Sequence, residues 1–448
     1  MTAEPVSFLT KIFRPAPATE PLTDPGEITD QYGRWQKRVL ISSIIGYATF
    51  YFVRKNLSIA MPAMEAQLGI HKAQLGLFLS MHGVLYGVSK FANGIFADRA
   101  NARIFLVVGL SVSAILNVFF GLSSTVLALG IIWTLNGWFQ GMGFPPCARL
   151  ITNWFSPREL ATKFALWNMS HQIGGALVFI LCGYLVGFSW RLCFFVPAVI
   201  ALLCSLFLWL TLPDTPPSVG LPEIEGTTTG DATAGEKPEE FRRFLIEHVF
   251  TNKYIWIVSL ANFFVYIIRY SLVDWGPTLL TETKHIGITH ASWMVAGFEF
   301  CGLFGAIIGG YLTDRYFRGR AIPICLAFMI LAGVCVFLFL KIPAQSEITT
   351  ATLLGFTGFF VYGPQCLLAV TAANLATKKA AATAIGLTSI FGYASTVLSG
   401  WGLGLVVQRY GWDLAFEGLI VAAALGALLF VLALPAKAHG YGEDAAES

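Results

Sequence analysis

The chain has 448 residues, of which 56% are hydrophobic and 12% are charged, and its mean hydropathy is +0.67. Soluble domains carry about 25% charged residues, so this composition excludes a soluble globular protein and predicts an integral membrane protein. The net charge of +3 is small, and the placement of the basic residues is more informative than their sum.

The chain begins with a polar, Pro-rich segment, residues 1–38, which we expect to be cytoplasmic. It contains no apolar run, so no cleavable signal peptide is expected and the first membrane helix should act as the insertion signal. Twelve apolar segments follow, each long enough to cross a hydrocarbon core of about 30 Å. Their approximate bounds are 39–62, 75–97, 104–122, 127–148, 161–186, 192–212, 254–280, 291–312, 322–340, 350–373, 382–407 and 414–434.

One long polar stretch, 213–250, divides these segments into two sets of six. We interpret it as a cytoplasmic linker. The sequence therefore predicts an all-α membrane protein with 12 transmembrane helices in two pseudo-symmetric six-helix bundles, 39–212 and 251–436, and a cytoplasmic tail at 437–448.

The basic residues predict the orientation. Of the 29 Lys and Arg residues, twenty fall in the N-terminal segment, the even-numbered loops and the C-terminal tail, and five fall in the odd-numbered loops. Basic residues near membrane helices favour the cytoplasmic side. Both termini are therefore expected in the cytoplasm. A bacterial inner (plasma) membrane is the expected location.

An internal repeat supports the division into two halves. Gly94-Ile-Phe-Ala-Asp98-Arg99 follows the second segment and Gly310-Tyr-Leu-Thr-Asp314-Arg315 follows the eighth. The pattern is similar to the cytoplasmic signature of the major facilitator superfamily. In such a signature Asp98, Arg99, Asp314 and Arg315 would act in gating, by tying neighbouring helix ends together in one state. The alternative is a solvated charged loop that only enforces orientation.

Two arginines lie inside apolar segments at matching places of the two halves. Arg54 precedes Asp98 by 44 residues, and Arg269 precedes Asp314 by 45. A charged side chain at bilayer depth costs at least about 2.5–3.5 kcal/mol on insertion scales. An anionic ligand held between the halves would explain both. The alternative is a buried salt bridge with Asp274 or Glu299.

Aromatic and basic residues share helix faces around these arginines. The groups are Tyr47, Tyr51 and Arg54; His82, Tyr86 and Lys90; Trp167 and His171; and Tyr266 and Arg269. Arg can bind phosphate oxygens bidentately, and Lys90 and His171 could add further cations, so the pattern favours a phosphate ester. The alternatives are packing for each aromatic ring, snorkelling for Lys90, an interhelical hydrogen bond for His171 and pairing of Lys55 with a carboxylate.

The sequence contains no enzyme motif of the zinc-peptidase, nucleophile-elbow or phosphate-loop type, so no catalytic residue, cofactor or metal is expected. The eight cysteines lie in or beside apolar runs and form no Cys-x-x-Cys pair. We interpret them as small buried hydrophobic residues.

At these residues the chain resembles the organophosphate:phosphate antiporters of the major facilitator superfamily. The resemblance runs from about Tyr32 to about Leu434. It rests on Tyr51-Phe-Val-Arg54-Lys55, Tyr86-Gly-Val-Ser-Lys90, Trp138-Phe-Gln-Gly-Met-Gly-Phe-Pro-Pro-Cys147, Trp167-Asn-Met-Ser-His171, Phe264-Val-Tyr266-Ile-Ile-Arg269, Asp274-Trp275-Gly-Pro, Tyr362-Gly-Pro and Phe391-Gly-Tyr393. It implies the major facilitator fold and transport by alternating access.

The resemblance also implies site residues. Arg54 and Arg269 would bind the substrate phosphate, with Lys90 and His171 close by. The aromatic residues that would line the cavity are Tyr47, Tyr51, Tyr86, Trp138, Trp167, Tyr266, Tyr362 and Tyr393. One departure concerns the sugar: segment 383–407 contains no charged residue, unlike the hexose-phosphate uptake carriers.

The expected function is exchange of an organophosphate, with hexose 6-phosphate such as glucose 6-phosphate preferred, for inorganic phosphate. The expected partners are the phosphate ester, inorganic phosphate and the lipid bilayer, and no nucleic acid. One alternative is a transporter-like hexose-phosphate sensor with a membrane kinase as partner. The segment Pro216-Pro-Ser-Val-Gly-Leu-Pro resembles the corresponding segment of that sensor branch. Others are a glycerol-3-phosphate:phosphate antiporter and a proton-coupled sugar symporter.

Overall fold

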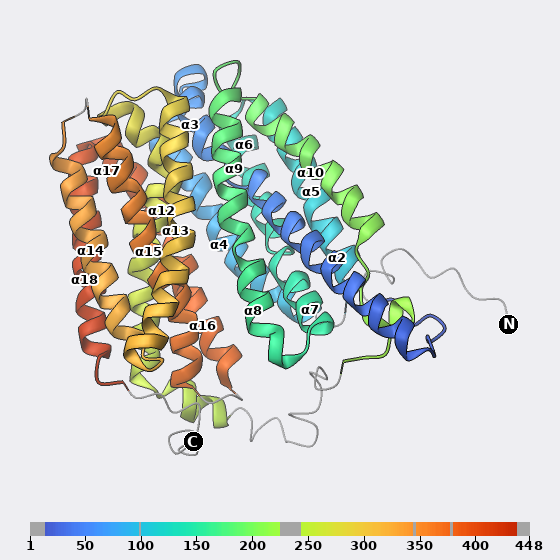
Figure 1. Cartoon of the computed structure of the whole chain (residues 1–448). Coiled ribbons are helices and arrows are strands. Elements are labelled where there is room, and N and C mark those ends of the chain that lie inside the picture. Colours follow the sequence, from blue (N-terminus) through green and yellow to red (C-terminus); the bar gives the residue numbers. More distant parts are fainter. Residues whose placement is uncertain (1–13, 98–99, 225–242, 344–345, 377–379, 437–448) are drawn as a thin grey trace. The chain divides into compact units, whose positions relative to one another are not determined.

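The protein is described from a computed structural model. The structure describes residues 14–97, 100–224, 243–343, 346–376 and 380–436. Within these ranges every regular element is helical, and no strand is present (Figure 1). The all-α fold class predicted from the sequence is therefore confirmed.

The chain forms two compact units, each assembled from separated stretches. Unit 1 comprises residues 1–57, 88–178 and 191–229, and unit 2 comprises residues 58–87, 179–190 and 230–448. The boundary between them passes through three helices, α3 (Asn56–Leu68), α4 (Lys72–Ala97) and α9 (Ser170–Leu185). The predicted bundles 39–212 and 251–436 and the linker 213–250 remain predictions, because this division concerns compactness alone.

Unit 1 is built on helices from the first half of the chain. They are α2 (Pro25–Phe52), α5 (Ala102–Leu122), α6 (Val126–Gln140), α7 (Phe144–Trp154), α8 (Pro157–Asn168) and α10 (Leu192–Thr211), with parts of α4 and α9 and a 3₁₀ turn at Pro216–Val219. Their buried side chains form one core in which Phe50, Leu110, Ile151, Trp154 and Leu208 take part.

Unit 2 is built mainly on the second half of the chain. Its helices are α12 (Lys253–Thr283), α13 (Ile288–Phe317), α14 (Ile322–Lys341), α15 (Glu347–Leu375), α16 (Ala381–Ala394), α17 (Leu403–Tyr410) and α18 (Trp412–Ala433). Two π-helical turns, Ile246–Phe250 and Val397–Gly402, and most of α3 (Asn56–Leu68) complete it.

Glycines allow the helices of unit 2 to pack closely. A Cβ added to Gly305 of α13 would collide with the carbonyl oxygen of Phe359 on α15, and one added to Gly358 of α15 would collide with that of Phe298 on α13. Small residues at helix contacts are the usual way for membrane helices to gain packing contacts, since lipid is as apolar as the side chains themselves. These positions therefore fix the α13–α15 pair.

An ionic cluster joins the α3–α4 turn to two other helices of unit 2. Lys72 Nζ lies 2.7 Å from Glu65 Oε1 and 2.9 Å from Glu282 Oε1. The indole nitrogen of Trp412 donates to Glu282 Oε2 at 2.8 Å. One cation thus holds two carboxylates that would repel each other without it.

Ten helical stretches of the described residues are long and apolar enough to cross a membrane. They correspond to ten of the twelve predicted segments. The two others, 39–62 and 127–148, are each divided between consecutive helices: α2 and α3 in the first case, α6 and α7 in the second. Neither half alone is both long and apolar enough to cross a membrane. A count of twelve membrane segments therefore treats each of these two helix pairs as one segment.

The division of the fourth segment follows from its sequence. α6 ends at Gln140, and Gly141-Met-Gly143 separates it from α7, which begins at Phe144 and has Pro145 and Pro146 in its first turn. Proline lacks an amide proton and clashes with the preceding helical turn, so it is tolerated at a helix start and not in the interior. The first segment has no such residue at its break, which lies at Val53-Arg54-Lys55.

The first helix starts earlier than the apolar pattern predicts. α2 begins at Pro25 because the Asp24 carboxylate accepts the amide proton of Glu27 at 2.8 Å and caps the helix. Such a cap contributes about 1 kcal/mol. Residues 25–38 of the predicted polar segment are therefore a helical extension of the first membrane segment.

Candidate substrate-binding site

Arg54 lies at the break between α2 and α3 in unit 1. The sequence phase placed it on one helix face with Tyr47 and Tyr51, but α2 ends at Phe52, so Arg54 is outside the helix. Its guanidinium carbon nevertheless lies 5.4 Å from the ring centroid of Tyr51, and the side chain is 8% exposed. Tyr51 is therefore close to Arg54, as expected, although the two residues do not belong to one helix.

Aromatic rings continue from Tyr51 through unit 1. Tyr47 lies 5.8 Å from Tyr51 and 4.8 Å from Trp167, centroid to centroid. The His171 ring lies 5.8 Å from Tyr51, and its Nδ1 is hydrogen-bonded to the carbonyl oxygen of Asn168. Trp167 donates its indole proton to the carbonyl oxygen of Ser43 at 3.3 Å. Four predicted site residues thus adjoin one another beside Arg54.

Lys90 joins this group through a residue that the sequence analysis did not select. Its ammonium lies 3.9 Å from the ring centroid of Phe144, a cation–π contact. Phe144 in turn lies 6.1 Å from Tyr47 and 5.3 Å from Trp167. Trp138 is half-buried on α6, and its carbonyl oxygen accepts the hydroxyl proton of Ser89, next to Lys90.

Arg269 lies in unit 2, inside the unbroken helix α12, and is 4% exposed. Its guanidinium carbon lies 5.8 Å from the ring centroid of Tyr266, 5.3 Å from Tyr270 and 4.7 Å from Tyr362. The predicted pairing of Tyr266 with Arg269 on one face is confirmed. Tyr270, which was not selected, belongs to the same group.

Tyr362 connects Arg269 to a carboxylate. Arg269 Nε donates to the Tyr362 hydroxyl oxygen at 3.0 Å, and the hydroxyl donates to Oε2 of Glu299. Tyr362 and Glu299 are both fully buried. The ring fits because Gly302 has no side chain, and a Cβ there would collide with it. Glu299, named from the sequence as an alternative partner of Arg269, is therefore linked to it through a tyrosine.

The remaining predicted aromatics of unit 2 lie beside Tyr266. Tyr393 lies 6.1 Å from Tyr266, and Tyr86 lies 5.0 Å from Tyr393. Tyr86 is 2% exposed. Each unit therefore surrounds one buried arginine with aromatic rings, a setting that can cover an organic body while the guanidinium binds an anion.

The predicted gating residues are only partly described. Asp98 and Arg99 lie outside the described residues. Asp314 and Arg315 lie in the last turn of α13, where both are exposed and Arg318 ends the helix in a left-handed conformation (φ 52°). Their gating role remains a prediction.

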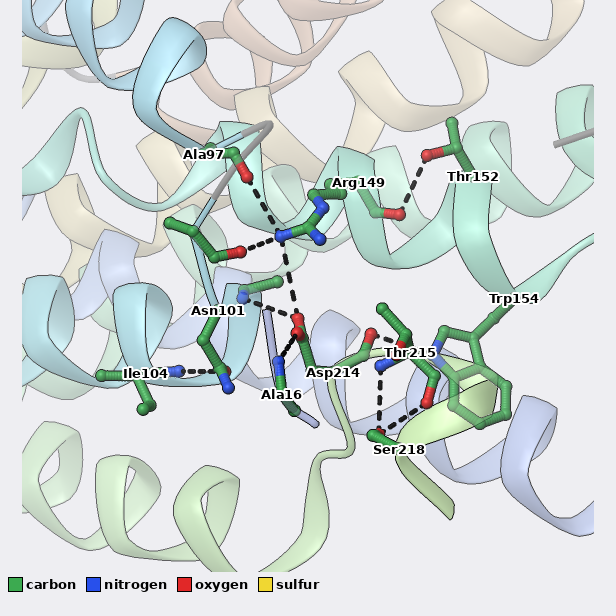
Figure 2. A network of polar contacts seen from close by, with 12 residues as sticks. Ala16, Ala97, Asn101, Ile104, Arg149, Thr152, Trp154, Asp214, Thr215 and Ser218 are labelled. Atoms are coloured by element: carbon green, nitrogen blue, oxygen red, sulfur yellow. Dashed lines mark hydrogen bonds and ion pairs between the residues drawn. The ribbon is translucent and has the colours of Figure 1, made fainter. Parts of the chain in front are cut away.

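A further buried ionic group of unit 1 was not foreseen (Figure 2). The carboxylate of Asp214, just after α10, accepts amide protons from Ala102 at 2.8 Å and Ala16 at 2.9 Å, and lies 3.8 Å from Arg149 Nη1. Arg149 also donates to the carbonyl oxygens of Ala97 and Ala100. These contacts join the ends of α4, α5 and α10 to α7 and to the segment before α2, so we interpret the group as structural.

Comparison with known proteins identifies the family. Residues 43–400 match the family model described as Major Facilitator Superfamily. The chain belongs to the major facilitator superfamily. A solved structure of a bacterial homologue of the human lysosomal transporter Spinster, inward-facing and occupied, has the same fold, with a TM-score of 0.74 at 14% identity over 90% of this chain and 97% of that one.

Relatives of higher identity specify the branch. A probable hexose phosphate transport protein of Chlamydia trachomatis is 38% identical, covering 95% of this chain and 97% of that protein. The glycerol-3-phosphate transporter of Bacillus subtilis is 38% identical, covering 94% and 97%. The membrane sensor protein UhpC of Escherichia coli is 35% identical, covering 95% and 98%. The chain is thus a member of the organophosphate:phosphate antiporter family, as the sequence motifs predicted.

Proposed function

We propose that this protein is a secondary transporter that exchanges an organophosphate, preferably a hexose 6-phosphate, for inorganic phosphate. The observation that carries the proposal is the buried arginine in each half of the chain, 8% exposed at Arg54 and 4% exposed at Arg269, each among aromatic rings. The names of the relatives in Chlamydia trachomatis and Bacillus subtilis support the substrate class.

The proposed binding chemistry assigns a role to each group. The guanidinium groups of Arg54 and Arg269 bind the phosphate dianion, because a planar fork with several N–H donors matches phosphate oxygens. Lys90 and His171 add positive charge, and the aromatic residues around them contact the organic part. The residues proposed to do so are Tyr47, Tyr51, Tyr86, Trp138, Trp167, Tyr266, Tyr362 and Tyr393.

Exchange follows from the electrostatics of this arrangement. In the proposed site, two guanidinium groups that share one phosphate would repel each other without it, and each is costly to dehydrate. A bound dianion compensates both effects, and so lowers the barrier to alternating access. The empty carrier should switch slowly, so exchange should exceed net flux. The excess of basic residues in the even loops supports an inner-membrane orientation with both termini in the cytoplasm.

Counterflow into phosphate-loaded proteoliposomes tests the proposal. Glucose 6-phosphate and glycerol 3-phosphate are offered externally, with vesicles lacking internal phosphate as the baseline. We expect rapid uptake of glucose 6-phosphate only into loaded vesicles, unaffected by a proton uncoupler. Uptake abolished by the uncoupler, or equally rapid into empty vesicles, would contradict phosphate exchange.

Arg54→Lys and Arg269→Lys should each reduce exchange at least tenfold, because an ammonium cannot form the bidentate contact, whose charged hydrogen bonds contribute about 1.5–3 kcal/mol each. Arg409→Lys is the matched control, since Arg409 is exposed at the end of α17. Rates near those of the unchanged protein in both buried-site variants would show that these arginines are structural.

A receptor is the second candidate. The membrane sensor protein UhpC of Escherichia coli is 35% identical over 95% of this chain, and the Pro216–Pro222 segment resembles that branch. Such a protein would signal the presence of hexose phosphate to a membrane kinase. Binding of glucose 6-phosphate without measurable counterflow would favour this alternative.

A further inference from the structure

The break in the first membrane segment is held by side chains of other helices. Between α2 and α3, the residues Val53, Arg54 and Lys55 leave the helical path. The amide protons of Arg54 and Lys55 still bond to the Tyr51 carbonyl, at 3.3 and 3.0 Å. Such a break in an apolar interior leaves carbonyl groups that need other donors, because each unsatisfied group costs several kcal/mol in a membrane.

Two asparagines supply the donors for the Val53 carbonyl. Asn117 Nδ2, from α5, donates to the Val53 oxygen at 3.0 Å, and Asn136 Nδ2, from α6, donates to the same oxygen at 2.9 Å. Asn56, on the far side of the break, donates to Asn117 Oδ1 at 2.8 Å and to the Cys193 carbonyl at 2.8 Å. These three amides are at most 1% exposed.

The bonded carbonyl fixes the backbone that carries Arg54. The Val53 carbonyl and the Arg54 nitrogen and Cα belong to one planar peptide unit. Two hydrogen bonds to that oxygen therefore hold this peptide plane and the direction of the Arg54 N–Cα bond, and so restrict where the Arg54 side chain can extend. Arg269 needs no comparable device, because α12 continues through it without interruption.

We propose that Asn117 and Asn136 are positioning residues for Arg54: by binding the Val53 carbonyl they orient the guanidinium for the phosphate. The inference rests on the proposed function, in which Arg54 binds phosphate. Interhelical amide bonds can also be purely structural. The two roles differ in their effect on ligand binding, because a purely structural bond lowers stability without changing affinity in the folded protein.

Binding of inorganic phosphate to the purified full-length protein, measured by calorimetry together with thermal stability, tests this role. Asn136→Leu removes one of the two hydrogen bonds to the Val53 carbonyl and is expected to raise the dissociation constant about five- to tenfold, as for one hydrogen bond. Leu129→Ala is the control, since Leu129 is fully buried on the same helix α6. It should lower the melting temperature at least as much while leaving phosphate affinity unchanged.

A double-mutant comparison separates the two hypotheses. In an Arg54→Lys background, Asn136→Leu should cause no further loss of affinity, because the positioned group is absent. Unchanged affinity in Asn136→Leu, or an equal additional loss in the Arg54→Lys background, would overturn the positioning role. Unchanged affinity in Arg54→Lys alone would instead overturn the proposed function. If Asn136→Leu does not fold, Asn136→Ala removes the same donor and is measured in its place.

Discussion

The hydroxyl group of Tyr362 offers a sharp test of how unit 2 is stabilised. It accepts a hydrogen bond from Arg269 Nε at 3.0 Å and donates one to Glu299 Oε2, so a single oxygen links α12, α13 and α15. Tyr362→Phe removes that oxygen and keeps the ring in the space beside Gly302. The substitution therefore isolates the two hydrogen bonds from the packing.

The expected loss follows from the charges of the partners. Hydrogen bonds to charged groups contribute about 1.5–3 kcal/mol each, which gives an upper bound of about 6 kcal/mol. Interhelical hydrogen bonds in a membrane protein average about 0.6 kcal/mol, because the unfolded chain in the membrane also finds partners. Both partners here are ionisable and at most 4% exposed, so we expect about 2–4 kcal/mol for Tyr362→Phe, or a lower melting temperature by about 2–4 °C for a chain of this length.

Thermal unfolding in detergent measures this effect, with Tyr316→Phe as control because Tyr316 is 69% exposed. A double-mutant cycle with Glu299→Gln tests whether the carboxylate is the partner that matters. Once the carboxylate is neutral, the loss caused by Tyr362→Phe should shrink, so the double variant should lose less than the sum of the single variants. A melting temperature for Tyr362→Phe within about 1 °C of the unchanged protein, or strict additivity, would show that the Tyr362 hydroxyl does not stabilise unit 2 through these two partners.

Two further predictions concern packing and the ionic group of unit 1. Gly305→Ala should lower stability by about 1–3 kcal/mol, because the added methyl collides with the Phe359 carbonyl; the matched control Gly310→Ala, with open space around its Cβ, should not change the melting temperature. Asp214→Ala should lower stability by about 3–5 kcal/mol, since it leaves two amide donors and Arg149 without their shared acceptor. Asp214→Asn, which keeps one acceptor oxygen, should lose less, and equal yields of folded protein for both Asp214 variants in size-exclusion chromatography would contradict this reading.

Much of the architecture could be predicted because it depends on composition. Ten of the predicted segments correspond to helices that can span a membrane, since every backbone polar group in lipid must be bonded within its own helix. The aromatic neighbours of Arg269 could also be found, because α12 is regular and side chains three or four residues apart meet on one face. Tyr51 lies beside Arg54 as predicted, although Arg54 itself is outside the helix from whose phase the neighbourhood was predicted.

The missed residues share one property: their role depends on contacts with other helices. Asn117 and Asn136 each stand out in the sequence as a polar amide within an apolar segment, which is a signal of an internal partner. The sequence does not reveal that both donate to the same carbonyl. Asp214 likewise lies in a polar stretch, where a carboxylate is normally solvated, and only the fold brings Ala102 and Ala16 to it.

Hydropathy, charge placement and motif spacing are properties of the chain alone, so they were enough to predict a membrane protein with a repeated pattern and a buried cation in each repeat. How each arginine is held depends on contacts between helices, which the chain pattern does not contain. Arg269 stays in a continuous helix. Arg54 lies at a break, where the carbonyl of Val53 accepts hydrogen bonds from asparagines of α5 and α6. The two halves can differ in this way because a helix ends where other helices supply better hydrogen-bond partners for its backbone.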